Sequence, residues 1–175
     1  MLKRLLVILA ATLGLSATLT SSAAAAQPLI QMEIGSMMGR WYEVARLPNM
    51  IQHGCQAGAS DWTRTLEGFN VIQSCHKGGP DGPLAEWRAK AKVADRSNAR
   101  FRMTFFGGLV SQEYWVLEHR PDQGWLILST RDGKYLWLMS QKPILPATIR
   151  AQAVSRIRQL GFDPARLEFP LPAHG

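Results

Sequence analysis

Four side chains that can ligate a metal lie at or beside the two cysteines of the chain. His53 and Cys55 are two residues apart, and Cys75 and His76 are adjacent. Two Cys and two His can bind Zn²⁺, but this spacing matches none of the usual zinc ribbons. The alternative is a disulfide between Cys55 and Cys75, which would close a loop of about 20 residues and stabilise the fold by about 3 kcal/mol.

Catalytic motifs are absent from the sequence. It contains no G-x-S-x-G nucleophile elbow, no H-E-x-x-H zinc motif, no phosphate-binding glycine loop and no convincing pair of carboxylates. The remaining histidines, His119 and His174, are scattered. We therefore predict that the protein is not an enzyme and that it needs no cofactor.

The N-terminal residues are typical of a secretory signal peptide. Met1 to Arg4 form a basic region, an apolar stretch follows to about Thr18, and the small residues 21–26 resemble an A-x-A cleavage site. The apolar stretch is shorter than the roughly 20 residues that a membrane span needs. We predict a signal peptide at 1–26, cleaved after Ala26, and a single domain at 27–175.

Export affects the interpretation of the cysteines and of the charge. An oxidising compartment favours the disulfide over the zinc site. No cysteine precedes Cys55, so we expect a soluble protein, periplasmic or secreted, and not a lipoprotein.

The formal net charge of +7 falls to +5 when Lys3 and Arg4 leave with the signal. The basic residues are dispersed, so we predict no nucleic-acid partner, whereas peripheral contact with an anionic membrane fits the charge.

Short segments of alternating apolar and polar residues fill the predicted domain. Phe101, Met103 and Phe105, for example, would share one face of a strand. Strands are expected at 41–47, 56–63, 69–75, 87–93, 100–105, 113–118, 124–129 and 134–140. Eight strands joined mostly by tight turns predict an all-β fold, an antiparallel up-and-down barrel that leaves no exposed edge.

The segment 146–160 departs from the two-residue period of the strands. Ile149, Ala153, Ile157 and Leu160 recur at helical spacing, which predicts a helix over 146–160. We expect this helix to pack against the outside of the barrel and a short last strand to follow at 166–169.

The segment Gly39-Arg40-Trp41-Tyr42-Glu43-Val44-Ala45-Arg46 resembles the G-x-W signature in the first strand of lipocalins. Similar to the same family, in order, are Phe105-Phe106-Gly107, Tyr114-Trp115-Val116-Leu117, Tyr135-Leu136-Trp137-Leu138-Met139-Ser140 followed by Pro143, and Gly161-Phe162-Asp163. On these residues the chain is identified as a member of the bacterial lipocalins, in the branch of the outer-membrane lipoproteins and apolipoprotein D. The resemblance implies a barrel that binds a lipid-like ligand. Because some lipocalins catalyse isomerisation or hydrolysis in their cavities, a cavity-based isomerase or hydrolase is one alternative, and a haem or tetrapyrrole carrier is another.

The family also assigns structural roles at the closed end of the barrel. Gly39 and Trp41 belong to the G-x-W motif, and an Arg of the last strand packs over this tryptophan. In this chain the Arg position falls at Gln141, which departs from the family. We expect the contact to be lost or to pass to a neighbouring basic group such as Lys142.

With Trp41 placed inside, strand alternation assigns the inward side chains. Trp41, Ala45 and Phe101 are expected to fill the core. Small inward residues, Gly58, Ser60, Ala89 and Ala91, are expected to leave a void that suits an acyl chain. The predicted ligand contacts are Glu43, Trp62, Met103, Phe105, Tyr114, Tyr135, Trp137 and Met139. Together with the family resemblance, these residues predict a protein that binds, stores or transports a fatty acid or lysophospholipid, and the resemblance implies a role in envelope lipid maintenance.

The polar inward side chains and the exterior of the barrel lead to further expectations. A buried Glu43 needs a partner, either a structural hydrogen bond or the ligand itself. The hydroxyls of Tyr114 and Tyr135, or a basic residue at the open end, could hold a carboxylate or phosphate head group. Trp115 is expected on the exterior, where it and the arginine-rich faces could form a homodimer interface or a membrane surface.

Overall fold

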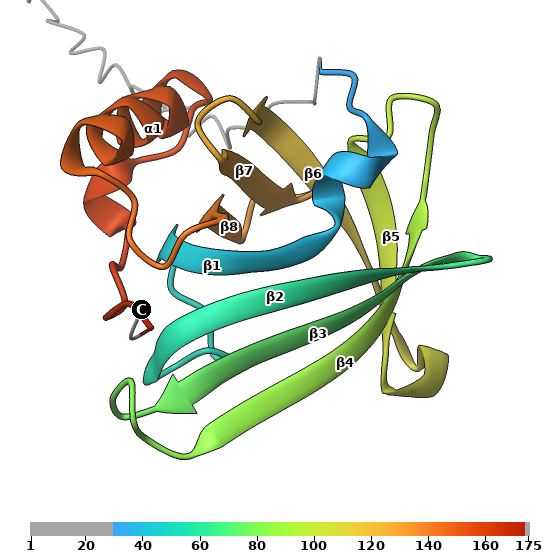
Figure 1. The fold of residues 1–175 in the computed structure, drawn as a ribbon, viewed down its shortest axis with the longest axis horizontal. Helices are drawn as coiled ribbons and strands as arrows, with labels where there is room; N and C mark the ends of the chain where they lie inside the picture. Colours follow the sequence, from blue (N-terminus) through green and yellow to red (C-terminus); the bar gives the residue numbers. More distant parts are fainter. Residues whose placement is uncertain (1–29, 174–175) are drawn as a thin grey trace, which may run out of the picture.

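The computed structural model describes residues 30–173, and the predicted signal peptide lies outside this range. Antiparallel strands close into a barrel in sequential order, as predicted (Figure 1). Their bounds are β1 Gly39–Arg46, β2 Cys55–Thr65, β3 Gly68–Lys77, β4 Leu84–Val93, β5 Arg100–Phe105, β6 Val110–Arg120, β7 Trp125–Thr130 and β8 Leu136–Ser140. Each strand pairs with its sequence neighbours, and β8 pairs with β1.

Within residues 30–173 a single α-helix, α1 (Ala147–Gln159), packs on the outside of the barrel beside β7 and β8 (Figure 1). Ala153 and Ile157 are fully buried on its inner side. The Arg156 guanidinium also donates to the Glu118 carboxylate of β6 at 2.7 Å. The predicted exterior helix is therefore confirmed, and it is attached by both apolar and ionic contacts.

The predicted last strand at 166–169 is wrong. The segment begins with a 3₁₀ turn, η3 (Pro164–Arg166), and then forms one isolated bridge between Arg46 and Glu168. Pro170 follows two residues later. Because proline has no backbone N–H, the chain does not extend this bridge into a ladder.

Two hydrophobic clusters lie on opposite faces of the barrel wall. The inner cluster fills the barrel and includes Trp41, Trp62 and Phe101. The outer cluster lies between the wall and α1. Trp115 belongs to the outer cluster and is only 5% exposed. The expectation that Trp115 offers a dimer or membrane surface is therefore wrong, because α1 and its neighbours cover that face.

Bulges in three strands change the alternation of faces. In β1, Glu43 pairs with Met139 but Ala45 pairs with Leu138, so one extra residue is accommodated between them. Ala45 therefore packs in the outer cluster, and its predicted inward position is wrong. The bulges in β2 and β6 lie between Gln56 and Ala59 and between Val116 and Glu118.

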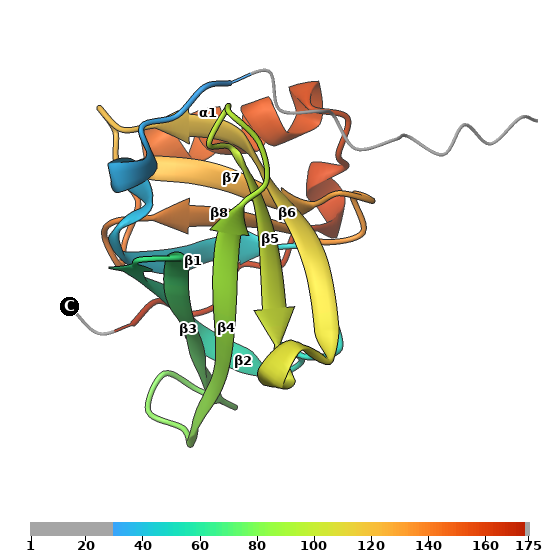
Figure 2. The same cartoon turned by 90° about the vertical axis from the view of Figure 1, so that its right-hand side faces the viewer.

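The two ends of the barrel differ. A 3₁₀ turn, η1 (Ile34–Met37), covers the end at which β1 begins, and Met32 N donates to Ser97 O of the β4–β5 loop at 2.8 Å. The other end, the open end, carries loops 47–54, 78–83, 106–109 and 131–135. Figure 2 shows two of these together, the β3–β4 hairpin and the turn η2 (Phe106–Gly108).

Candidate functional site

The candidate site is a small cavity inside the barrel. Its walls are mostly apolar, with a few polar side chains, and consist of Met37, Trp41, Glu43, Ala59, Ser60, Trp62, Gln73, Tyr114, Leu126, Leu128, Trp137 and Met139. The cavity volume is about 20 Å³, which holds about one water molecule. The predicted void is thus much smaller than an acyl chain requires.

The void is small because bulky side chains occupy the space beside the small residues. Trp62 and Phe101 pack edge to face with ring centroids 5.3 Å apart, and Phe69 completes the group. Ala89 and Ala91 are buried against this inner cluster. The sequence shows which residues face inward, whereas the remaining volume depends on the rotamers of these aromatic side chains.

Five of the eight predicted ligand contacts line the cavity, and three do not: Met103, Phe105 and Tyr135. Met103 is fully buried in the packed inner cluster. Phe105 is partly buried with its ring 6.5 Å from that of Tyr114. Tyr135 precedes β8, is 38% exposed, and stacks at 6.1 Å against Trp137. Phe105 and Tyr135 therefore lie at the entrance rather than in the wall.

Glu43 is the charged residue of this lining, and it is buried. Arg46 Nη1 donates to Glu43 Oε1, and Gln52 Nε2 donates to Glu43 Oε2 at 2.6 Å. Burial raises the pKa of Glu43, and the Arg46 guanidinium and the two hydrogen bonds oppose this rise. The structure therefore gives Glu43 protein partners for both carboxylate oxygens.

Arg46 joins this carboxylate to the C-terminal segment. Its guanidinium also contacts Glu168 Oε2 at 3.1 Å and donates to Cys55 O at 3.2 Å. Glu43 and Arg46 are three residues apart and would lie on opposite faces of a regular strand. The β1 bulge places both inside, and Arg46 then pairs with Trp137. Sequence alternation missed Arg46 for this reason.

Gln52 connects the β1–β2 loop to the same network. Its side chain is buried and bridges two walls, because Oε1 accepts from Trp137 Nε1 at 2.7 Å while Nε2 donates to Glu43. Asn49 holds Gln52 in place through Nδ2–Oε1 and N–Oδ1 bonds of 2.8 Å. Met50 and Ile51, between them, are 93% and 66% exposed. Loop 47–54 thus covers the cavity, and no sequence pattern pointed to Gln52.

A glycine makes room for the Glu43 carboxyl. A Cβ at Gly58 would lie 3.1 Å from Glu43 Cβ and Cδ and 3.2 Å from Oε2. Gly58 was predicted to leave a void, and the side chain of Glu43 occupies that space instead.

At the closed end, Trp41 Nε1 donates to Met37 O at 3.1 Å. Gln141 lies beyond β8 and is exposed, as is Lys142, so the predicted transfer of the arginine contact to Lys142 is wrong. The ring that packs edge-on against Trp41 is His119, with centroids 6.3 Å apart. The β6 bulge turns His119 inward. Burial lowers the pKa of His119.

The Cys55–Cys75 disulfide is present and fully buried, with a Cα–Cα distance of 5.4 Å. It joins β2 to β3 near the open end. Because both thiols are consumed, the alternative zinc site with His53 and His76 is excluded. Within residues 30–173 there is no group of three or more His, Cys, Asp or Glu side chains suited to a metal ion.

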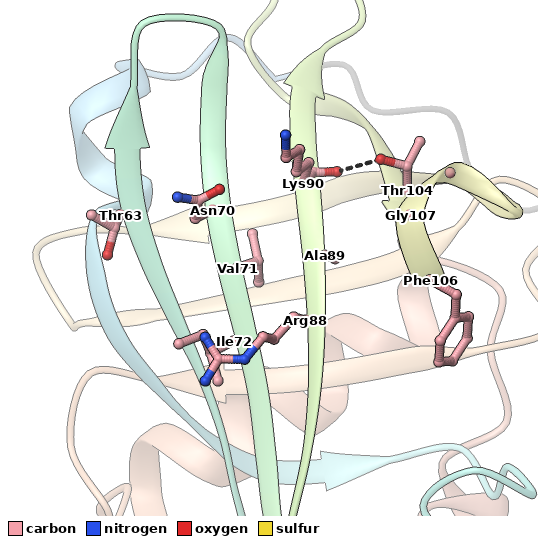
Figure 3. A pocket seen from close by; sticks show the side chains of 11 residues that line it. Thr63, Asn70, Val71, Ile72, Arg88, Ala89, Lys90, Thr104, Phe106 and Gly107 are labelled. Atoms are coloured by element: carbon pink, nitrogen blue, oxygen red, sulfur yellow. Dashed lines mark hydrogen bonds between the residues drawn. The ribbon is translucent and has the colours of Figure 1, made fainter.

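A larger hollow of about 590 Å³ lies on the outer face of β2–β5 beside η2 (Figure 3). Its rim includes the polar side chains of Asn70, Arg88, Lys90 and Thr104, and Thr104 Oγ1 donates to Lys90 O at 3.4 Å. This hollow is wide and open to solvent. An apolar ligand gains little by binding there, so the barrel interior is the better candidate despite its small volume.

The helix α1 of the described part of the chain is too short and too polar to cross a membrane, and no other helix there qualifies.

Comparisons with known proteins agree with this geometry. The family model of the lipocalin-like domain matches residues 32–172. The outer membrane lipoprotein Blc of Vibrio cholerae is 27% identical over 81% of this chain and 83% of its own length. Apolipoprotein D of Rattus norvegicus is 26% identical over 65% of this chain and 63% of its own. Insecticyanin of Manduca sexta has a similar fold, with a TM-score of 0.68 and 15% identity over 82% of each chain.

Proposed function

Because this chain belongs to the lipocalin family, in the branch of the outer membrane lipoprotein Blc and apolipoprotein D, we propose that it binds, stores or transports a lipid-like ligand inside its barrel. Lipocalins as a family bind small hydrophobic ligands. The observation that carries the proposal is the apolar barrel interior under loop 47–54, whose buried Gln52 side chain reaches into the cavity entrance. The proposed role is that of a binding protein and not of an enzyme.

The ligand has to open the cavity, since the present volume is only about 20 Å³. Displacing the side chain of Gln52 breaks a small number of hydrogen bonds, each worth about 0.5–1.5 kcal/mol, or somewhat more to the charged carboxylate. The unbranched side chains of Met37 and Met139 can adapt their rotamers to an acyl chain. Opening therefore costs a few kcal/mol.

Ligand burial outweighs that cost. Burying about 16 methylenes contributes on the order of 13 kcal/mol, at about 0.8 kcal/mol each. Association itself costs an estimated 4–15 kcal/mol, at the lower end for a small ligand. With both costs subtracted, binding is favoured by roughly 6 kcal/mol, which corresponds to a Kd in the tens of micromolar.

We also propose an exported protein that acts in envelope lipid maintenance and contacts an anionic membrane with its open end. The tips of two loops there carry exposed apolar side chains: Met50, Ile51, Phe106 and Leu109. Replacing Met50 and Ile51 by serine should reduce flotation with anionic vesicles. Leu66→Ser is the matched control, because Leu66 is fully exposed at the opposite end. Equal losses in both variants would refute this orientation.

The test of the ligand proposal is native mass spectrometry of protein purified from the periplasm of its own cell, combined with lipid extraction. We expect one apolar molecule per chain, which quenches tryptophan fluorescence when added back to stripped protein, because Trp137 lies at the cavity entrance. An empty barrel that binds neither fatty acid, lysophospholipid nor long-chain alcohol would refute the proposal. Recovery of a chemically altered lipid would favour the cavity-based enzyme, and a visible absorption band would favour the tetrapyrrole carrier.

A further inference from the structure

The charge inside the cavity is unlike that of a site for anionic lipids. Among the twelve described residues that line it, none is Lys, Arg or His, and the acid is Glu43. Arg46 lies behind Glu43 and already contacts a second carboxylate, that of Glu168. A ligand carboxylate would therefore become the third carboxylate around one guanidinium, which electrostatic repulsion disfavours.

The side chain of Gln52 indicates which head group the site accepts. Its carbonyl oxygen accepts from Trp137 Nε1, and its NH₂ group donates to Glu43 Oε2. The two walls of the cavity entrance thus present one donor and one acceptor, and a single neutral amide satisfies both. A ligand that displaces Gln52 has to supply the same pair of hydrogen bonds, or else leave buried polar groups unpaired.

Few head groups meet this requirement. An ionised carboxylate accepts from Trp137 but has no proton to donate to Glu43. An ammonium donates to Glu43 but has no lone pair for Trp137. A hydroxyl or a primary carboxamide both donates and accepts. Tyr114 adds a neutral neighbour, because burial raises its pKa to about 12, and its ring lies 5.8 Å from that of Trp137.

Given the proposed ligand site in the barrel, we propose that it selects apolar molecules with a neutral hydroxyl or carboxamide head group, which takes the place of Gln52 between Trp137 and Glu43. The tail then lies against the apolar floor formed by Leu126, Leu128 and Met139. This inference narrows the ligand class and departs from the fatty acid expected from the sequence.

The experiment compares decanol, decanamide, decanoate and decylammonium, which share one chain length and differ in the head group. Each competes with a neutral fluorescent probe, 1-aminoanthracene, for the mature protein at pH 7.5. We expect decanol and decanamide to bind at least about tenfold more tightly than the two ions, corresponding to one hydrogen bond to a charged group. Equal or tighter binding of decanoate would overturn the inference and leave the proposed function standing. Absence of binding by all four compounds and the probe would overturn both.

Two variants test whether the preference for neutral head groups arises at Gln52. Gln52→Ala removes the competing amide, so decanol and decanamide should gain affinity severalfold, whereas decanoate should gain less because it still cannot donate to Glu43. Gln123→Ala is the matched control, because Gln123 Oε1 accepts from Trp125 Nε1 at 2.8 Å in the β6–β7 turn, at the opposite end of the barrel. A gain of the same size for decanoate in Gln52→Ala, or for decanol in Gln123→Ala, contradicts the assignment.

Glu43→Gln tests the repulsion directly. It should abolish the preference for neutral heads over decanoate, provided that circular dichroism shows a folded barrel. If this variant does not fold, the Gln52→Ala comparison decides by itself.

Discussion

Replacing Arg46 by methionine removes the guanidinium that contacts Glu43 and leaves this carboxyl buried with the Gln52 hydrogen bond. The variant also frees Cys55 O and the half-exposed carboxylate of Glu168. Breaking one side of a buried pair typically costs 3–5 kcal/mol. For a domain of this size that corresponds to a fall in Tm of roughly 10 °C.

The pKa of Glu43 determines how the loss of stability in Arg46→Met depends on pH. Burial already raises the pKa of Glu43, and loss of the Arg46 guanidinium raises it further. A raised folded-state pKa means that the folded protein holds the proton more tightly than the unfolded chain. Stability from this group is present below the unfolded pKa and is lost as pH rises through the folded pKa. Arg46→Met should therefore be less destabilising at pH 5 than at pH 8.

Urea unfolding with the disulfide intact measures both effects, and Glu43→Gln together with Arg46→Met completes a double-mutant cycle. The double variant should recover part of the loss, since no unpaired carboxylate is then buried. A loss below about 1 kcal/mol in Arg46→Met, or equal losses at the two pH values, would refute the reasoning, because a buried unpaired charge produces neither.

Three further changes test other parts of the structure. Gly58→Ala should cost about 1–3 kcal/mol in urea unfolding, because the added methyl group would lie 3.1 Å from Glu43 Cβ and Cδ, tighter than an ordinary van der Waals contact, and the hydrogen bonds of Glu43 resist its displacement; an unchanged midpoint would contradict this packing. Burial lowers the pKa of His119, so the folded protein loses stability as pH falls below the unfolded value; His119→Gln should lessen this loss between pH 7.5 and 5, and parallel pH profiles would count against it. Replacing Cys55 and Cys75 by serine should cost 2–5 kcal/mol, measured as the shift in thermal unfolding, and an unshifted transition would mean that the bridge adds no stability.

The barrel and its helix follow from local patterns in the sequence. Alternation in segments such as 100–105, together with turn residues between them, was enough to predict the strands. The 3.6-residue spacing of Ile149, Ala153 and Ile157 was enough to predict α1. Each strand or helix buries one face, so the period of its apolar residues can be found within its own sequence.

The candidate site was predicted less well, and the bulges are the main reason. A bulge depends on how a strand pairs with its neighbour, which the alternation of one strand does not reveal. The prediction therefore placed Ala45 inside and overlooked Arg46, and it missed His119 beside Trp41. Gln52 was missed for a different reason, because its position depends on how loop 47–54 folds back over the cavity.

The contact between Glu168 and Arg46 links the far end of the chain to the cavity entrance. Glu168 N donates to Arg46 O at 2.9 Å, and the Glu168 carboxylate contacts the guanidinium that also holds Glu43. Leu171 continues the attachment, since its carbonyl accepts from Ala57 N at 2.8 Å. The rate of amide hydrogen exchange at Glu168 and Ala57 should therefore change when a ligand occupies the barrel. The C-terminal segment thus offers a label-free spectroscopic reporter of ligand binding, and a fusion partner is better attached elsewhere.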